Sequence, residues 1–170
     1  MQKQRIFGAI VVILVALGLY MFFKGDTLED EIDRGESERI RVEDVTRELT
    51  SQLGVSVSEN VERIALEDVQ GETATGLATK DYADSEYKHS VLAALPDLES
   101  GTYYNGWLVR GEEGEVDYSV VNSGKLRQSK GGYLLEYSSN KDLSDYTTVW
   151  VTLETKDDDN PETRVLESEF

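Results

Sequence analysis

The sequence YYNGWLVR at residues 103–110 and the sequence TVWVTLE at residues 148–154 both alternate in the way that a β-strand does. Successive side chains of an extended chain point to opposite sides, so every second residue shares a face. The residues that share one face of each segment are Tyr103, Asn105, Trp107 and Val109, and Val149, Val151 and Leu153. β-Branched and aromatic residues dominate both segments, which is typical of strands. Both segments are therefore predicted to be strands.

Six further segments have a similar composition and are separated by Gly, Pro, Asn, Asp and Ser. These candidate strands are residues 62–69, 73–79, 87–95, 115–121, 132–137 and 164–169. Short strands at intervals of roughly 8–12 residues, with no amphipathic helix among them, are typical of sandwiches. The sequence thus predicts an all-β domain over residues 61–170, an antiparallel β-sandwich of 7–8 strands.

The sequence IFGAIVVILVALGLYMFF at residues 6–23 predicts one transmembrane helix before this domain. Its 18 uncharged residues would span about 27 Å as a helix, close to the hydrocarbon core of a bilayer. Lys3 and Arg5 precede the run, and an acidic segment follows Lys24. The positive-inside rule then places residues 1–5 in the cytoplasm and the C-terminal domain outside a plasma membrane, as a single-pass protein.

A cleaved signal peptide is the alternative for the same segment. Its apolar part should be only about 7–15 residues long and should end at a site with small residues. Here the run continues through Tyr20 and ends in Phe22 and Phe23. An uncleaved anchor is therefore the preferred interpretation, with the bilayer as a partner of residues 6–23.

Residues 24–60 are charged and contain no aromatic residue, which predicts an acidic stalk or linker. Part of the stalk has helical spacing, with a glycine at the position where a helix would end. These residues are Val42, Val45, Leu49 and Leu53, followed by Gly54. Two interpretations remain open: an amphipathic helix that docks on the domain or pairs with a second copy, or a transient helix within the stalk.

The net charge of −17 is concentrated after the apolar segment. Residues 1–23 contribute +2, and the rest of the chain carries 15 basic and 34 acidic residues, a balance of −19. Such a surface repels phosphate groups, which argues against nucleic acid as a partner. The chain has no cysteine, which excludes disulfides, thiolate metal sites and a cysteine nucleophile.

The outer domain contains the sequences ALPDLESGTYYNGWLV, VWVTLE and NPETRVLE. These three segments resemble the extracytoplasmic C-terminal domain of the anti-sigma-K factor family, and the resemblance covers roughly residues 61–170. The matching positions are Leu95, Pro96, Gly101, Tyr104, Trp107, Leu108, Val109, Val149, Val151, Thr152, Leu153, Glu154, Pro161, Val165 and Leu166. The resemblance implies a β-sandwich in a membrane signalling system. Only about five residues precede the predicted span here, so the family's cytoplasmic sigma-binding domain has no counterpart.

His89 is the only histidine, and it alternates with Val91, Ala93 and Leu95 on one predicted strand. This pattern is typical of a packed histidine, and no G-x-S-x-G context for a nucleophile is present. With no supported catalytic group, the sequence predicts that the protein is not an enzyme and has no catalytic residue.

Two candidate sites remain in the outer domain. Asp157, Asp158 and Asp159 supply oxygen atoms of the kind that Ca²⁺ prefers, although the EF-hand pattern is lacking and no other cofactor is indicated. Trp150 and Tyr104 are a candidate binding surface, although aromatic residues on strands more often belong to the core. Two functions follow from these features. The preferred one is a non-enzymatic sensor or interaction module with a membrane or extracytoplasmic protein partner, and the alternative is a Ca²⁺-dependent structural or adhesion domain.

Overall fold

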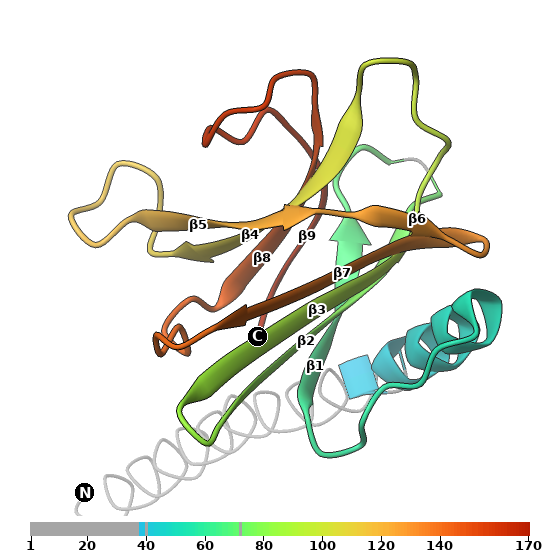
Figure 1. Ribbon diagram of the computed structural model, residues 1–170, viewed down its shortest axis with the longest axis horizontal. Coiled ribbons are helices and arrows are strands. Elements are labelled where there is room, and N and C mark those ends of the chain that lie inside the picture. Colours follow the sequence, from blue (N-terminus) through green and yellow to red (C-terminus); the bar gives the residue numbers. More distant parts are fainter. Residues whose placement is uncertain (1–37, 40, 72) are drawn as a thin grey trace, which may run out of the picture. The chain divides into compact units, whose positions relative to one another are not determined.

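Residues 41–170 form one compact unit in the computed structural model. The structure describes residues 38–39, 41–71 and 73–170. Nine strands follow one another along the described chain (Figure 1). They are β1 (Glu62–Asp68), β2 (Thr75–Ala83), β3 (Glu86–Ala94), β4 (Tyr103–Arg110), β5 (Ser119–Lys125), β6 (Arg127–Ser129), β7 (Gly132–Ser139), β8 (Thr148–Glu154) and β9 (Thr163–Glu169).

The strands form one antiparallel sheet that almost closes on itself. Their order is β5-β4-β8-β9-β1-β2-β3-β7-β6. Strand β1 links the two halves of this sheet, because Glu62 to Leu66 pair with β2, whereas Glu67 and Asp68 pair with β9. The two ends of the sheet are consecutive pieces of chain, since only Leu126 separates β5 from β6. The amide of Leu126 donates to the carbonyl of Tyr104, at 2.9 Å.

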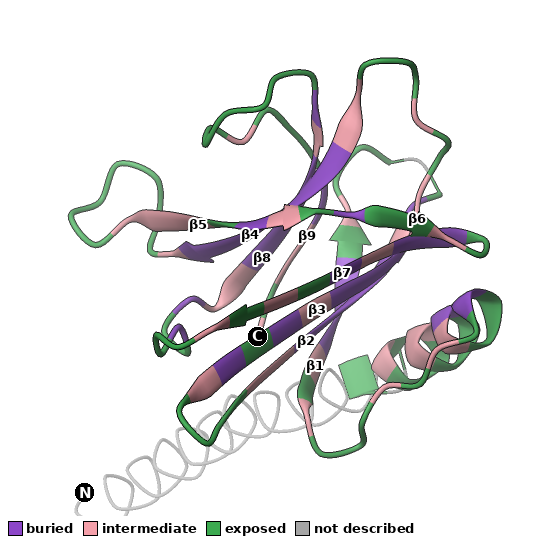
Figure 2. Cartoon of the chain, in the orientation of Figure 1, coloured by how far each residue is buried: buried purple, intermediate pink, exposed green. Residues whose placement is uncertain are grey.

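One hydrophobic core lies between the two halves, as between the layers of a sandwich. Figure 2 shows buried positions on strands of both halves. Tyr87, Val91 and Leu135 enter this core from one half, and Leu108 and Val149 enter it from the other. The halves approach closely at Gly106 of β4, where an added Cβ would meet the side chain of Leu135 of β7. The antiparallel all-β class predicted from the sequence is therefore confirmed, with nine strands instead of seven or eight.

Each of the eight predicted strands overlaps an observed one, but the strand predicted at residues 115–121 begins only at Ser119 and runs to Lys125. The other differences lie in a turn and in one short strand. Strands β2 and β3 are joined by a turn of only two residues, so their hairpin is longer than predicted. The two turn residues, Asp84 and Ser85, adopt positive φ angles of 54° and 64°. Two such residues in succession make a tight hairpin turn, and neither is the glycine that usually signals it. The three residues of β6, Arg127–Ser129, lack the β-branched and aromatic composition that predicts strands.

Residues 38–39 and 41–53 are helical, and the helix at residues 41–53 packs on the outer face of β2 and β3. Leu49 and Leu53 are buried against Leu77 and Leu92. The helix ends where predicted, at Gly54, whose φ angle is 66° and whose amide donates to the carbonyl of Thr50. Of the two interpretations of this segment, the structure shows a helix docked on the domain. Residues 41–60 thus belong to the compact unit that holds the strands, although the sequence places them in the stalk.

The predicted tail at residues 1–5, the predicted span at residues 6–23 and the stalk up to residue 37 lie outside the described residues. Within the described part of the chain, no helix combines the length and apolar character needed to cross a bilayer.

Candidate functional site

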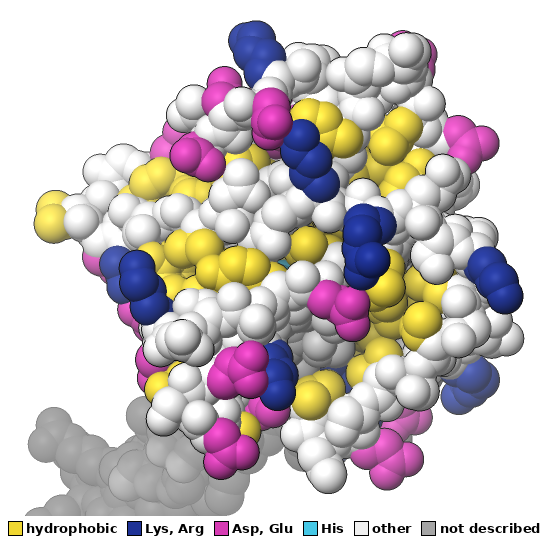
Figure 3. Space-filling view, in the orientation of Figure 1, with side chains coloured by type: hydrophobic (Ala, Val, Ile, Leu, Met, Phe, Trp, Pro, Cys, Tyr) yellow, Lys and Arg dark blue, Asp and Glu magenta, His cyan; other side chains and the backbone are white. Residues whose placement is uncertain are grey.

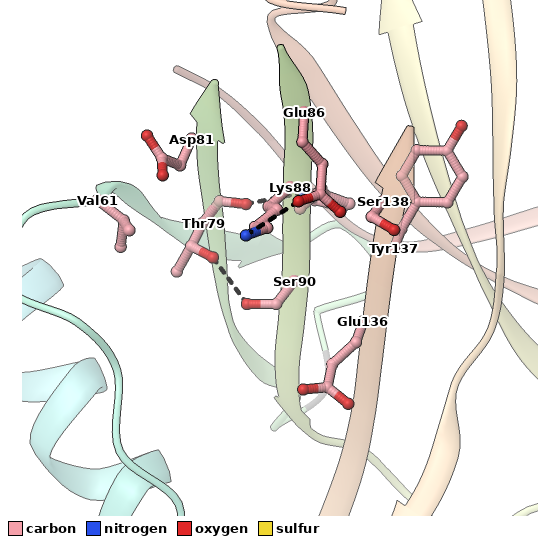
Figure 4. Close-up of a pocket in the computed structure, with 10 residues that line it drawn as sticks. Val61, Thr79, Asp81, Glu86, Lys88, Ser90, Glu136, Tyr137 and Ser138 are labelled. Carbon is pink, nitrogen blue, oxygen red and sulfur yellow. Dashed lines mark hydrogen bonds and ion pairs between the residues drawn. The ribbon is translucent and has the colours of Figure 1, made fainter. Parts of the chain in front are cut away.

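A polar groove of about 350 Å³ lies on strands β2, β3 and β7 (Figure 4). The strand register arranges the side chains of this face in rows that run across the three strands. The first row is Asp81, Lys88 and Ser138, and the second is Thr79, Ser90 and Glu136. A third row, Leu77, Leu92 and Leu134, packs with the helix at residues 41–53. The groove therefore continues the surface on which this helix is docked.

Hydroxyl groups form the floor of the groove. The side-chain oxygens of Thr79 and Ser90 lie 2.7 Å apart and share a hydrogen bond across the two strands. Beside them the ammonium group of Lys88 pairs with the carboxylate of Glu86, at 3.1 Å. Figure 4 shows these side chains projecting from the same face of β2 and β3. This arrangement presents both donors and acceptors of hydrogen bonds to a ligand.

The charges at the groove are mixed, and one carboxylate stands out. Glu136 pairs with Arg127 of β6, at 3.2 Å. Asp81 is half-buried, and its carboxylate makes no hydrogen bond or ion pair with any residue that the structure describes. Figure 3 shows the same mixture on a larger scale, with acidic and basic side chains scattered between hydrophobic ones. The geometry therefore favours a polar ligand over a purely apolar one.

His89 lies next to this groove, but its imidazole belongs to the core and is only 1% exposed. Its Nδ1 atom lies 2.9 Å from the carbonyl oxygen of Thr79, so Nδ1 carries the proton and donates it. The other ring nitrogen, Nε2, has no hydrogen-bond partner among the described residues. Burial disfavours the charged form and lowers the pKa of His89 to about 4. His89 is therefore a neutral, packed residue, as the alternation in the sequence predicts.

The three aspartates of the candidate Ca²⁺ site each have a different partner. Asp157 pairs with Lys125 at 3.1 Å, and a carboxylate oxygen of Asp158 accepts the amide of Asn160 at 2.9 Å. Asp159 accepts a long hydrogen bond, 3.4 Å, from the side chain of Asn122. Within the described ranges, no group of three or more His, Cys, Asp or Glu side chains could hold a metal ion.

The two residues of the candidate aromatic surface are buried, which corrects the prediction that they face a ligand. Tyr104 is 4% exposed, and its hydroxyl donates to the carbonyl of Pro96. Trp150 is 8% exposed, and the guanidinium of Arg164 lies 4.4 Å from its ring centre. Both faces of β8 are covered, so the alternation that predicts one exposed face does not hold there.

A buried polar chain on β4 and β8 is not evident from the sequence. The indole nitrogen of Trp107 donates to the hydroxyl of Thr152, at 2.6 Å, and Thr152 donates to the carboxylate of Glu154. The same carboxylate oxygen accepts the amide of Glu162, at 3.1 Å. Glu154 is only 1% exposed, and its other oxygen has no partner among the described residues. The strand alternation places Thr152 and Glu154 on one face, but it does not indicate that this face is covered.

Comparisons with protein-family models, with curated proteins and with solved structures found no match for this chain.

Proposed function

We propose that this chain is a non-enzymatic sensor or interaction module, anchored in the plasma membrane through residues 6–23. Its compact unit, residues 41–170, lies outside the membrane and binds a protein partner. In this proposal the unit is a sandwich-like module similar to the outer domain of anti-sigma-K factors and serves a membrane signalling system. The single observation that carries the proposal is the polar groove on β2, β3 and β7 beside the docked helix.

The groove supports an interaction role for a specific physical reason. Its side chains come from three neighbouring strands of a fully paired region, so their positions are fixed before a partner arrives. Pre-organised groups lose little freedom on binding, which favours affinity. Asp81 adds a carboxylate that no described residue engages. His89 is buried, its Nδ1 donates to the carbonyl of Thr79, and its pKa of about 4 makes it a weak base at neutral pH.

Membrane topology can be tested with single cysteines, because the natural chain has none. Gln2→Cys reports on the N-terminus, and Ser100→Cys reports on an exposed loop of the described domain. In intact cells a membrane-impermeant maleimide should label Cys at position 100 and leave position 2 unlabelled until the cells are opened. Labelling of position 2 but not of position 100 in intact cells would contradict the proposed orientation. Recovery of the protein in the soluble fraction after lysis would contradict the proposed anchor.

The interaction itself can be tested with a photo-crosslinking amino acid placed at Ser138, which is exposed in the groove. Glu112, exposed in the loop between β4 and β5, is a matched position away from the groove. We expect a discrete crosslinked protein in intact membranes from position 138 and none from position 112. Equal crosslinking at both positions, or none at either, would refute a partner at the groove.

A further inference from the structure

We propose that the helix at residues 41–53, here called the latch helix, is released and melts locally while the β-domain remains folded. Its release would lengthen the connection between the β-domain and the residues that precede it. The longer connection would act as a membrane tether only if the proposed anchor exists, whereas the release of the helix does not depend on that anchor. Three features of the structure carry the inference.

The first feature is that the latch helix has a hydrophobic cluster of its own. Leu49 and Leu53 of the helix pack with Leu77 and Leu92 on the outer face of the sheet. The main core between the two halves of the sheet contains no residue of the helix. The main core is instead built from strands and the loops between them. Removing the helix therefore leaves every contact of the main core in place.

The second feature is that the polar attachments of the latch helix are few and exposed. Arg41 pairs with Glu67 of β1 at 2.5 Å, and these side chains are 48% and 62% exposed. At the other end, the side-chain amide of Gln52 donates to the carbonyl of Gly131, in the turn between β6 and β7. Exposed ion pairs of this kind add little to stability. The attachment of the helix thus depends mainly on apolar contacts, made by the buried Leu49 and Leu53 together with the partly buried Val42 and Val45.

The third feature is the cost of keeping a helix in water without packing partners. Helices of fewer than about 12–15 residues are marginal in water, because nucleation is costly. When residues 41–53 leave the sheet they lose the packing that offsets this cost, so they should melt instead of remaining helical. Residues 41–53 span about 20 Å as a helix and up to about 45 Å when extended. Release therefore adds about 25 Å of reach to the connection.

The chain can change direction just after the latch helix, at Gly54. Gly54 has a φ angle of 66°, and nothing lies within 4 Å of the position that a Cβ would take there. Residues 55–61 then lead to β1, and Val61 lines the polar groove. The groove and the latch helix thus use neighbouring rows of the same strands. A partner in the groove would lie beside the leucines that hold the helix.

The release can be measured by hydrogen exchange on the full-length protein in detergent micelles. Local opening exposes amides without global unfolding, so the amides of residues 41–53 should exchange faster than those of β3. We expect a difference of about 100-fold, with weak dependence on denaturant for the helix and strong dependence for β3. Equal protection of helix and β3, with equal denaturant dependence, would overturn the proposal because both would then open only by global unfolding.

A pair of matched variants separates release from general destabilisation. The double variant Leu49→Ser, Leu53→Ser removes the two buried leucines that pack on the sheet. The double variant Glu43→Ser, Glu48→Ser changes only exposed positions of the same helix. The leucine variant should abolish helix protection and keep that of β3 and β7 within about threefold. The glutamate variant should change helix protection by less than about threefold. Loss of strand protection in the leucine variant would show that the helix is an integral part of the fold and would refute the latch.

Discussion

The indole nitrogen of Trp107 donates a hydrogen bond to the hydroxyl of Thr152 at 2.6 Å, and both residues are at most 1% exposed. They lie on neighbouring strands, β4 and β8, and are diagonal to one another, because Trp107 is paired in register with Trp150. The hydroxyl of Thr152 in turn donates to Glu154. One hydroxyl therefore satisfies a buried donor and a buried carboxylate at once.

Thr152→Val should destabilise the protein by about 1–3 kcal/mol. Valine has the shape of threonine but lacks the hydroxyl, so the indole nitrogen and the carboxylate of Glu154 would both lose a partner. The free energy of unfolding can be measured by urea titration with tryptophan fluorescence. Thr152→Ser, which keeps the hydroxyl and loses a methyl group, is the control. A valine variant as stable as the natural protein would show that this hydrogen bond contributes nothing.

His89 should make the protein less stable as the pH falls from about 6.5 to about 4. The pKa of His89 in the folded protein is about 4, below its ordinary value of 6.5, so the unfolded chain binds the proton first. The stability that neutral His89 contributes is fully present above pH 6.5 and is lost as the pH falls toward 4. Below pH 4 this contribution does not change further. The shift corresponds to about 3 kcal/mol.

The matched variant is His89→Asn, whose side-chain amide can still donate to the carbonyl of Thr79 but does not titrate in this range. Urea unfolding at a series of pH values should show a smaller loss of stability for the variant than for the natural protein. Parallel curves for the two proteins would mean that His89 is not buried in its neutral form.

Gly106→Ala should cost about 1–3 kcal/mol, because the added methyl group would meet the opposite half of the sheet. An added Cβ at this position would contact the side chains of Leu135 and Ser123. Leu135→Val shortens one of these neighbours and should reduce the cost of the alanine. The measurement is a double-mutant cycle of unfolding free energies. Strictly additive effects would show that Gly106 and Leu135 do not approach each other as described.

Ca²⁺ should leave the melting temperature unchanged to within about 1 °C, because a bound ion would stabilise the folded state. Ca²⁺ takes about six to eight oxygen ligands around one point, whereas Asp157, Asp158 and Asp159 have separate partners. The comparison is a thermal melt in millimolar Ca²⁺ and in chelator. A clear rise with Ca²⁺ that Asp157→Asn and Asp159→Asn abolish would instead support the Ca²⁺-dependent structural or adhesion domain.

Much of the β-domain could be predicted because its strands carry strong local patterns. The segments at residues 103–110 and 148–154 alternate clearly, and their predicted bounds agree with β4 and β8. The helix at residues 41–53 was visible in the spacing of its apolar residues and in Gly54. The turn at Asp84 and Ser85 is not evident from the sequence, because its residues adopt positive φ angles without a glycine.

The groove could not be predicted, because its residues come from three strands and its limits depend on their register. Thr79, Ser90 and Glu136 are separated in sequence but lie in one row across β2, β3 and β7. The burial of Trp150 and Tyr104 likewise depends on what covers each face of the sheet. Local alternation shows which residues share a face, but it does not show whether a second layer covers that face.

The sequence by itself determined the antiparallel β class, the helix before it, the acidic character and the packed histidine, because each follows from local periodicity or composition. Only the tertiary structure decided that the sheet nearly closes, that the helix docks on its outer face and that a polar groove lies beside it. These features arise from contacts between residues far apart in the chain. Such contacts depend on strand order and register, which local patterns do not encode.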